Sequence, residues 1–258
     1  MKRLMVFIGV LMFFLVSNVV YAGQFGPPEP AAKEGQSAGI GYFHYSAIWE
    51  PRNTEFAEIK FKQNQAYLQA DYYGLIKNKN CEFYLRVGGA DAEIKEAFLF
   101  DSGTPNFTDS LKFSFTTGFK GLLFSSRYFG VGPFLQASFS LMDYEDKKTG
   151  TILGIPASEK ITIKNPWDVN LGVGVQGKIL GVILYGGPVV YWARSQVKVE
   201  AEALGVTSAE STTYKEKNNV GGFAGLRFRL PLVKGFNVEF EGQLKSRFSF
   251  GGALTYVF

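Results

Sequence analysis

Charged side chains recur at every second position in several segments, and their pairing is the chemistry that the sequence offers most clearly. Arg227 and Arg229 stand in one such segment, and Glu239 and Glu241 stand in the next. A turn near Leu232 to Gly235 would set these pairs opposite or diagonal to each other on antiparallel strands. We therefore expect a lattice of internal ion pairs, with the candidate members Arg227, Arg229, Glu239, Glu241, Glu82, Arg86, Lys112 and Lys120.

Patterns for catalysis, metals and cofactors are weak by comparison. His44 is the only histidine, and it shares alternate positions with Tyr42 and Ser46, so it could face an interior. No local motif supplies a nucleophile with an orienting acid, and no His or Cys cluster has metal-ligand spacing. We predict no enzyme, no metal site and no cofactor. A hydrolase that uses His44 is the least favoured alternative.

The first residues have the features of a secretory signal. Lys2 and Arg3 form a basic head, an apolar run follows from Leu4 to Val16, and Ala22 ends a small-residue cleavage pattern. The run is too short to span a bilayer as a helix. We predict a signal peptide over 1–22 with cleavage after Ala22, and therefore export from the cytoplasm.

Two further regions follow the predicted signal. Residues 23–36 hold three prolines and read as an irregular, mobile periplasmic lead-in. From residue 37 to 258 the period is two, as in the alternation of Trp167, Val169, Leu171, Val173 and Val175 with polar or small residues. The alternating runs are near ten residues long, and Gly and charged residues lie on the second face. This pattern is typical of membrane strands with lipid outside and a polar lumen.

The fold that these segments predict is an all-β, antiparallel, up-and-down transmembrane barrel of about ten strands, with eight or twelve as alternatives. Short turns alternate with long connections at 49–63, 91–109, 143–165 and 198–218, as periplasmic turns alternate with external loops in such barrels. The stretch 55–75 changes parity, which suggests a bulge or a strand that extends beyond the membrane. Asp71, Asp168 and Lys245 also fall on the lumen parity. Cys81, the only cysteine, is expected to be a small apolar surface residue.

The end of the chain supports the same fold. Phe250, Leu254, Tyr256 and Phe258 share one face of the last strand, and the final residue is aromatic. This pattern resembles the C-terminal assembly signal of outer-membrane barrels, and the whole chain resembles the small outer-membrane β-barrel superfamily, which includes OmpA-like barrel domains. We expect this protein to lack the periplasmic peptidoglycan-binding domain that often accompanies OmpA-like barrels. The resemblance implies an outer-membrane location, with lipid, lipopolysaccharide, periplasmic chaperones and the barrel-assembly machinery as partners.

Aromatic residues near the predicted strand ends could form the interfacial girdles of such a barrel. The candidates are Trp49, Tyr72, Tyr128 and Trp167. The mature chain is only mildly basic and has no basic run, so we expect no nucleic-acid partner. The leading interpretation is a structural or surface-interaction barrel whose lumen is largely closed by ion pairs. The alternative is a narrow pore for small solutes.

Overall fold

A computed structural model describes residues 24–32, 34–53, 56–74, 80–230 and 233–258, so the predicted signal peptide lies outside the described residues. All the elements of the described chain are β-strands. They are β1 (Gly35–Pro51), β2 (Ile59–Tyr73), β3 (Cys81–Ile94), β4 (Phe107–Gly121), β5 (Phe124–Ser125), β6 (Phe129–Ser140), β7 (Tyr144–Ile152), β8 (Ile155–Ile179), β9 (Val182–Ala203), β10 (Val206–Glu216), β11 (Val220–Arg229), β12 (Phe236–Leu244) and β13 (Phe248–Val257). Within these residues no helix is long and apolar enough to cross a membrane.

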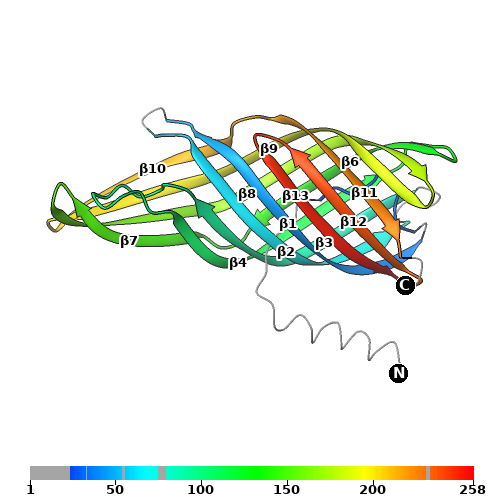
Figure 1. The fold of residues 1–258 in the computed structure, drawn as a ribbon, viewed down its shortest axis with the longest axis horizontal. Helices are drawn as coiled ribbons and strands as arrows, with labels where there is room; N and C mark the ends of the chain where they lie inside the picture. The colour runs from blue at the N-terminus through cyan, green and yellow to red at the C-terminus, as the bar shows by residue number, and fades with distance from the viewer. Residues whose placement is uncertain (1–23, 33, 54–55, 75–79, 231–232) are drawn as a thin grey trace, which may run out of the picture.

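Ten of the described strands close into a ring, which Figure 1 shows from the side. Their order is β1, β2, β3, β4, β6, β8, β9, β11, β12 and β13, and β13 pairs back with β1. Each neighbouring pair is antiparallel. The predicted up-and-down barrel of about ten strands is therefore confirmed.

The two faces of the barrel wall follow the alternation in the sequence. On β12, Glu239, Glu241 and Gln243 are buried inside, whereas Phe240 and Leu244 are 54% and 63% exposed on the outside. Large apolar residues on the outer face and polar residues inside are the arrangement that a lipid bilayer stabilises. The fold is therefore that of a transmembrane β-barrel.

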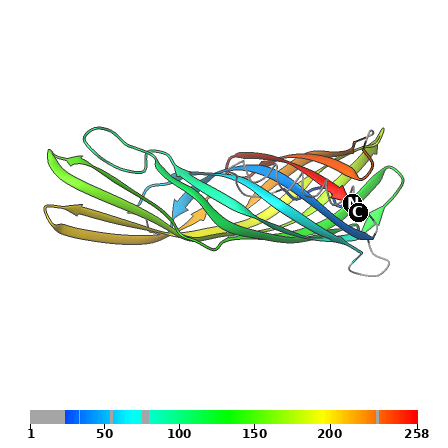
Figure 2. The ribbon, with the colours of Figure 1, turned by 90° about the horizontal axis from the view of Figure 1, so that it is seen from below.

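At one end of the barrel, which we call the extended end, several strands continue well beyond the ring. There β7 pairs with the first part of β8, and β10 pairs with the last part of β9. The first part of β8 and the last part of β9 also pair with each other, so these four strands make one sheet that projects beyond the ring (Figure 2). The connections predicted at 143–165 and 198–218 are thus mostly ordered hairpins and not irregular loops.

The extended end is filled by an aromatic and aliphatic group that we call the outer cluster. Trp49, Phe61, Phe98, Phe107 and Tyr144 are among its buried members. Outside the bilayer the outer face of a strand meets water, so apolar residues turn inward there. This accounts for the parity change in the sequence, because β1 and β2 pair from Trp49 to Gly35 without a register shift and no bulge is present.

Two sequence predictions about exposure are wrong. Trp49 is only 3% exposed and belongs to the outer cluster, so it is not an interfacial residue. Cys81 is buried at the start of β3 and does not lie on the surface. Trp49 is apolar and packs in the interior of the extended end, whereas Cys81 is buried at the opposite end of β3, on the parity of the outward-facing Phe83.

Candidate functional site

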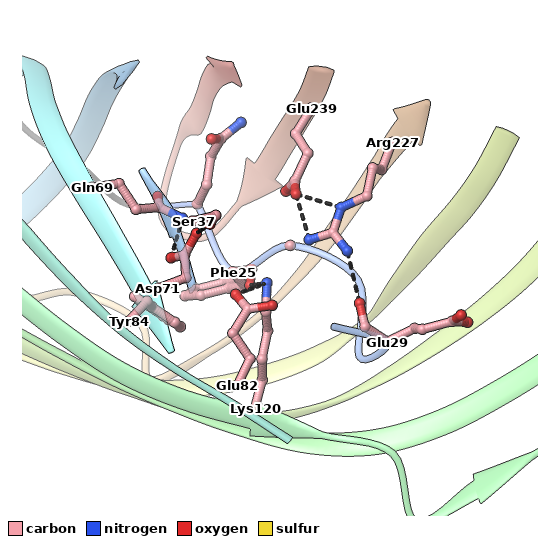
Figure 3. Close-up of polar contacts among 12 residues, drawn as sticks. Phe25, Glu29, Ser37, Gln69, Asp71, Glu82, Tyr84, Lys120, Arg227 and Glu239 are labelled. Carbon is pink, nitrogen blue, oxygen red and sulfur yellow. Dashed lines mark hydrogen bonds and ion pairs between the residues drawn. The ribbon is translucent and has the colours of Figure 1, made fainter. Parts of the chain in front are cut away.

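The predicted ion pairs form in the half of the barrel opposite the extended end. Arg227 faces Glu239 in the β11–β12 register, and the two side chains form a buried ion pair. On the other side of the lumen, Lys120 Nζ lies 3.0 Å from Glu82 Oε1, and both side chains are buried. Figure 3 shows the two pairs on opposite walls. The tight opposite-charge contacts offset the desolvation of charges inside the barrel.

In the described part of the chain, the other four candidates form no ion pair with one another or with these two pairs. Arg229 lies opposite Asn237 in the β11–β12 register, and Glu241 lies opposite Gly225. Lys112 is partly exposed toward the extended end, where its Nζ lies 3.1 Å from Asp109. Arg86 is buried and stacks over the Tyr84 ring, with 4.4 Å from its guanidinium carbon to the ring centroid.

The lumen between these charges is occupied by the chain's own residues 24–32, which we call the plug. The sequence predicted a mobile periplasmic lead-in here, but Gln24 and Phe25 are among the most buried residues of the barrel. The carboxylate of Glu241 accepts the backbone N–H of Phe25 at 3.0 Å and that of Gly26 at 2.9 Å. An irregular segment inside a barrel needs such partners, because its backbone groups have no strand neighbour.

Basic side chains satisfy the carbonyl groups of the plug in the same way. Arg86 donates to the Gln24 carbonyl at 2.6 Å, and Lys120 donates to the Phe25 carbonyl at 3.2 Å. Arg227 donates to the Glu29 carbonyl at 2.7 Å, and Arg229 donates to that of Ala31 at 3.0 Å. Hydrogen bonds with one charged partner are worth about 1.5–3 kcal/mol each. Most of the predicted lattice therefore serves to hold the plug as well as to pair charges.

Phe25 provides the apolar anchor of the plug. Its ring stacks on Phe134 with centroids 4.4 Å apart and meets the edge of Phe223 at 5.2 Å. The next residue, Gly26, has φ +73°, and a Cβ there would lie 2.4 Å from Lys120 Nζ. Gly26 is thus required both for the turn of the segment and for the approach of the lysine.

The far end of the plug is held by its acidic side chain. The carboxylate of Glu29 lies 2.5 Å from Lys178 Nζ and accepts a hydrogen bond from Gln176 at 2.6 Å. Pro28 lies against Gly174 of β8, where a Cβ would come within 2.7 Å of the proline ring. The small residue on the wall therefore leaves the space that the proline fills.

A cavity of about 40 Å³ with both aromatic and polar lining residues, which we call the chamber, lies inside the barrel between the plug and the outer cluster. Its lining includes Gln65, Gln136, Asp168 and Lys245. On one side it reaches Trp167, whose pairing with Phe139 is the last between β6 and β8, and β8 then shifts register against β9. The chamber thus meets the barrel wall where the sheet is least continuous.

His44 is not part of the lumen site. Its ring packs against Phe250 at 5.3 Å between centroids, and its Nδ1 lies 2.8 Å from Asn64 Oδ1. Phe250 is on the outer face, so the predicted lumen position of His44 is wrong. The described residues also contain no group of three or more His, Cys, Asp or Glu side chains that could hold a metal ion.

The remaining sequence candidates lie on the outer surface of the barrel. Tyr72 and Tyr128 are exposed there, and Trp167 is partly exposed. In the last strand, the side chains of Phe250 and Phe258 are exposed, and those of Leu254 and Tyr256 are partly exposed. These positions suit contact with lipid or with other proteins, as the sequence predicted.

The plug is the element of the candidate site that sequence reasoning missed. The signal that could have found it is Phe25 in a Gly- and Pro-rich stretch, close behind the predicted cleavage site. A large aromatic residue does not stabilise a mobile segment in water, whereas it stabilises a docked segment by burying apolar surface.

No protein-family model matches this chain, and no curated protein matches its sequence. Several solved barrels are similar in structure. The outer membrane protease OmpT from Escherichia coli is 9% identical with a TM-score of 0.43, covering 90% of this chain and 100% of that chain. The translocator domain of the autotransporter NalP from Neisseria meningitidis is 11% identical with a TM-score of 0.44, covering 88% and 90%. The Pseudomonas putida toluene transporter TodX is 11% identical with a TM-score of 0.35, covering 93% and 94%.

All three TM-scores are below 0.5, so the barrel fold of this chain is established by its own strand pairing and its pattern of buried and exposed residues. Identities this low assign no activity, since one fold supports many functions.

Proposed function

We propose that this protein is a gated outer-membrane conduit for small solutes, closed at rest by its plug. The observation that carries the proposal is that the charged side chains of the lumen bind the backbone of the plug. Glu241, Arg86, Lys120, Arg227 and Arg229 all bind backbone groups of residues 24–32. A barrel with a purely structural role could fill its lumen with wall side chains alone. A segment held by hydrogen bonds can leave and return.

Two barriers have to open along the proposed path. The plug closes the end of the barrel at which β1 begins and β13 ends. The outer cluster closes the extended end. In the proposed orientation the first barrier faces the periplasm and the extended end faces the outside, as expected for an even number of strands. Tyr72, Tyr128 and Trp167 then contact lipid and lipopolysaccharide, and the last strand is the contact for chaperones and the assembly machinery.

The test is solute efflux from liposomes that contain the purified protein. The wild type should release small solutes slowly, and a variant that lacks residues 24–32 should release them much faster. Heat-modified migration on gels shows whether the variant is folded. If the folded variant is as tight as the wild type, the outer cluster alone closes the lumen and the conduit is refuted.

A surface-interaction role is the second candidate. The hairpin turns of the projecting sheet carry Leu153 and Leu204, which are 89% and 79% exposed and adopt positive φ angles of 53°. A leucine in this conformation is costly, and neither side chain is buried in return. The observation favours a contact partner at the tips, which binding of the purified protein to cells would test. We further propose that the protein is not a hydrolase, because the described contacts of the outward-facing His44 are with Asn64 and Phe250, and neither side chain is a nucleophile.

A further inference from the structure

We propose that the chamber is a binding site for a small zwitterion, of the size and charge of the smallest α-amino acids. This proposal rests on the conduit function, and it names the solute class that the lumen accepts. It is carried by two opposite charges that face one cavity without pairing, and by two unpartnered amide atoms beside them.

The positive charge is Lys245. Its Nζ donates to Asn170 Oδ1 at 2.6 Å and lies 4.7 Å from the centroid of the Tyr191 ring. Among the described residues it has no carboxylate within 4 Å, although Asp168 and Glu216 lie near enough to be influenced by its charge. A lysine inside a barrel is ordinarily paired with a carboxylate.

The negative charge is Asp168. Its carboxylate accepts a hydrogen bond from Asn170 Nδ2 and forms no ion pair within 4 Å in the described part of the chain. The amide of Asn170 therefore lies between the two charges, with its oxygen on Lys245 and its nitrogen on Asp168. The charges are held apart and both line the chamber.

Two buried amide groups complete the site. Gln136 Nε2 is a donor and Gln65 Oε1 is an acceptor, and neither has a hydrogen-bond partner. Both residues line the chamber and are at least nine-tenths buried. A buried polar atom without a partner lowers stability, so a ligand that satisfies both atoms binds more tightly.

These groups define the ligand. Its carboxylate would accept from Lys245 and Gln136, and its ammonium group would donate to Asp168 and Gln65. A simple anion would leave Asp168 without an opposite charge, and a simple cation would leave Lys245 without one. A cavity of 40 Å³ holds about three waters, so the ligand has only a few heavy atoms in the plugged state.

The chamber is also in contact with the plug. Gln243, which lines the chamber, donates to Glu241 Oε1 at 2.8 Å, and Glu241 holds the first backbone groups of the plug. Lys245 Nζ lies 5.9 Å from the centroid of the Phe25 ring. A ligand that engages Lys245 thus acts on the anchor of the plug, which connects solute binding to opening.

The experiment is calorimetric titration of the folded, full-length protein in detergent with glycine. Acetate, methylammonium and acetamide are the matched probes for the anion, the cation and the neutral amide. Glycine should bind saturably, and each probe should bind at least about tenfold more weakly. Asp168→Asn and Lys245→Met should each weaken glycine binding by a similar factor, whereas Lys198→Met on the projecting sheet should not change it.

Several results would overturn the site. Glycine could bind no better than acetate or methylammonium, or Asp168→Asn, which keeps the side-chain shape, could leave its affinity unchanged. Absence of saturable binding both in the full chain and in the variant without residues 24–32 would also refute it. The liposome assay contains no glycine, so a permeable plug-free variant that binds no glycine refutes this site and leaves the conduit standing.

Discussion

Replacement of Phe25 by alanine should release the plug. The Phe25 ring is fully buried between Phe134 and Phe223 and supplies the main apolar contact of the segment. Burial and aromatic contacts of this kind make Phe→Ala substitutions cost about 3–5 kcal/mol in a packed interior. We take about 3 kcal/mol, because water can enter the space that the ring leaves. The population of undocked plug should then rise roughly a hundredfold.

Thiol labelling measures this population directly. Ala31 is buried in the plug, so a cysteine at that position reacts with a maleimide only when the segment is undocked. The background is Cys81→Ser, which removes the native thiol. The labelling rate of Ala31→Cys should rise roughly a hundredfold when Phe25→Ala is added.

The matched control is Phe98→Ala. Phe98 is also a fully buried phenylalanine, but it belongs to the outer cluster and does not touch the plug. It should lower the stability of the barrel without accelerating the labelling of Ala31→Cys. A Phe25→Ala rate within about fivefold of the parent would contradict the reasoning, since even 1 kcal/mol gives that factor.

Two further predictions concern charges. Arg227→Met should lower the free energy of unfolding in urea by about 3–5 kcal/mol, because it leaves Glu239 buried and unpaired, and adding Glu239→Leu should recover most of the loss. A double variant no more stable than the single one would show that the pair is not the cause. At the extended end, backbone N–H groups of Gly154 and Leu153 hydrogen-bond to Asp101 and lower the pKa of its carboxyl. The carboxylate should thus protect the β7–β8 turn fully above about pH 4. That protection should be lost as the pH falls through the lowered folded pKa. Hydrogen exchange of the two amides, corrected for intrinsic rates, should show this loss in the wild type and not in Asp101→Asn.

The barrel itself could be predicted from the sequence because its determinants are local. A membrane strand has a fixed period of two, so Phe240 and Glu241 are assigned to opposite faces without any knowledge of neighbouring strands. The opposition of Arg227 and Glu239 could be predicted for the same reason, since a short turn sets the register of a hairpin.

The candidate site could not be predicted from the sequence, because it is built from contacts between residues that lie far apart along the chain. The backbone of residues 24–32 is held by side chains 62 to 216 residues away, as in the bonds from Arg86 to Gln24 and from Phe25 to Glu241. A Pro-rich segment has no period of its own, so only the closed lumen gives it a conformation. The change from outward-facing to inward-facing apolar residues near Trp49 likewise depends on where the bilayer ends along the folded barrel.

The sequence alone thus determined the alternation of lipid-facing and interior residues along membrane strands such as β12. Only the tertiary structure decided what the interior holds, because a lumen forms after ten strands have closed and its charges can then bind the plug or each other.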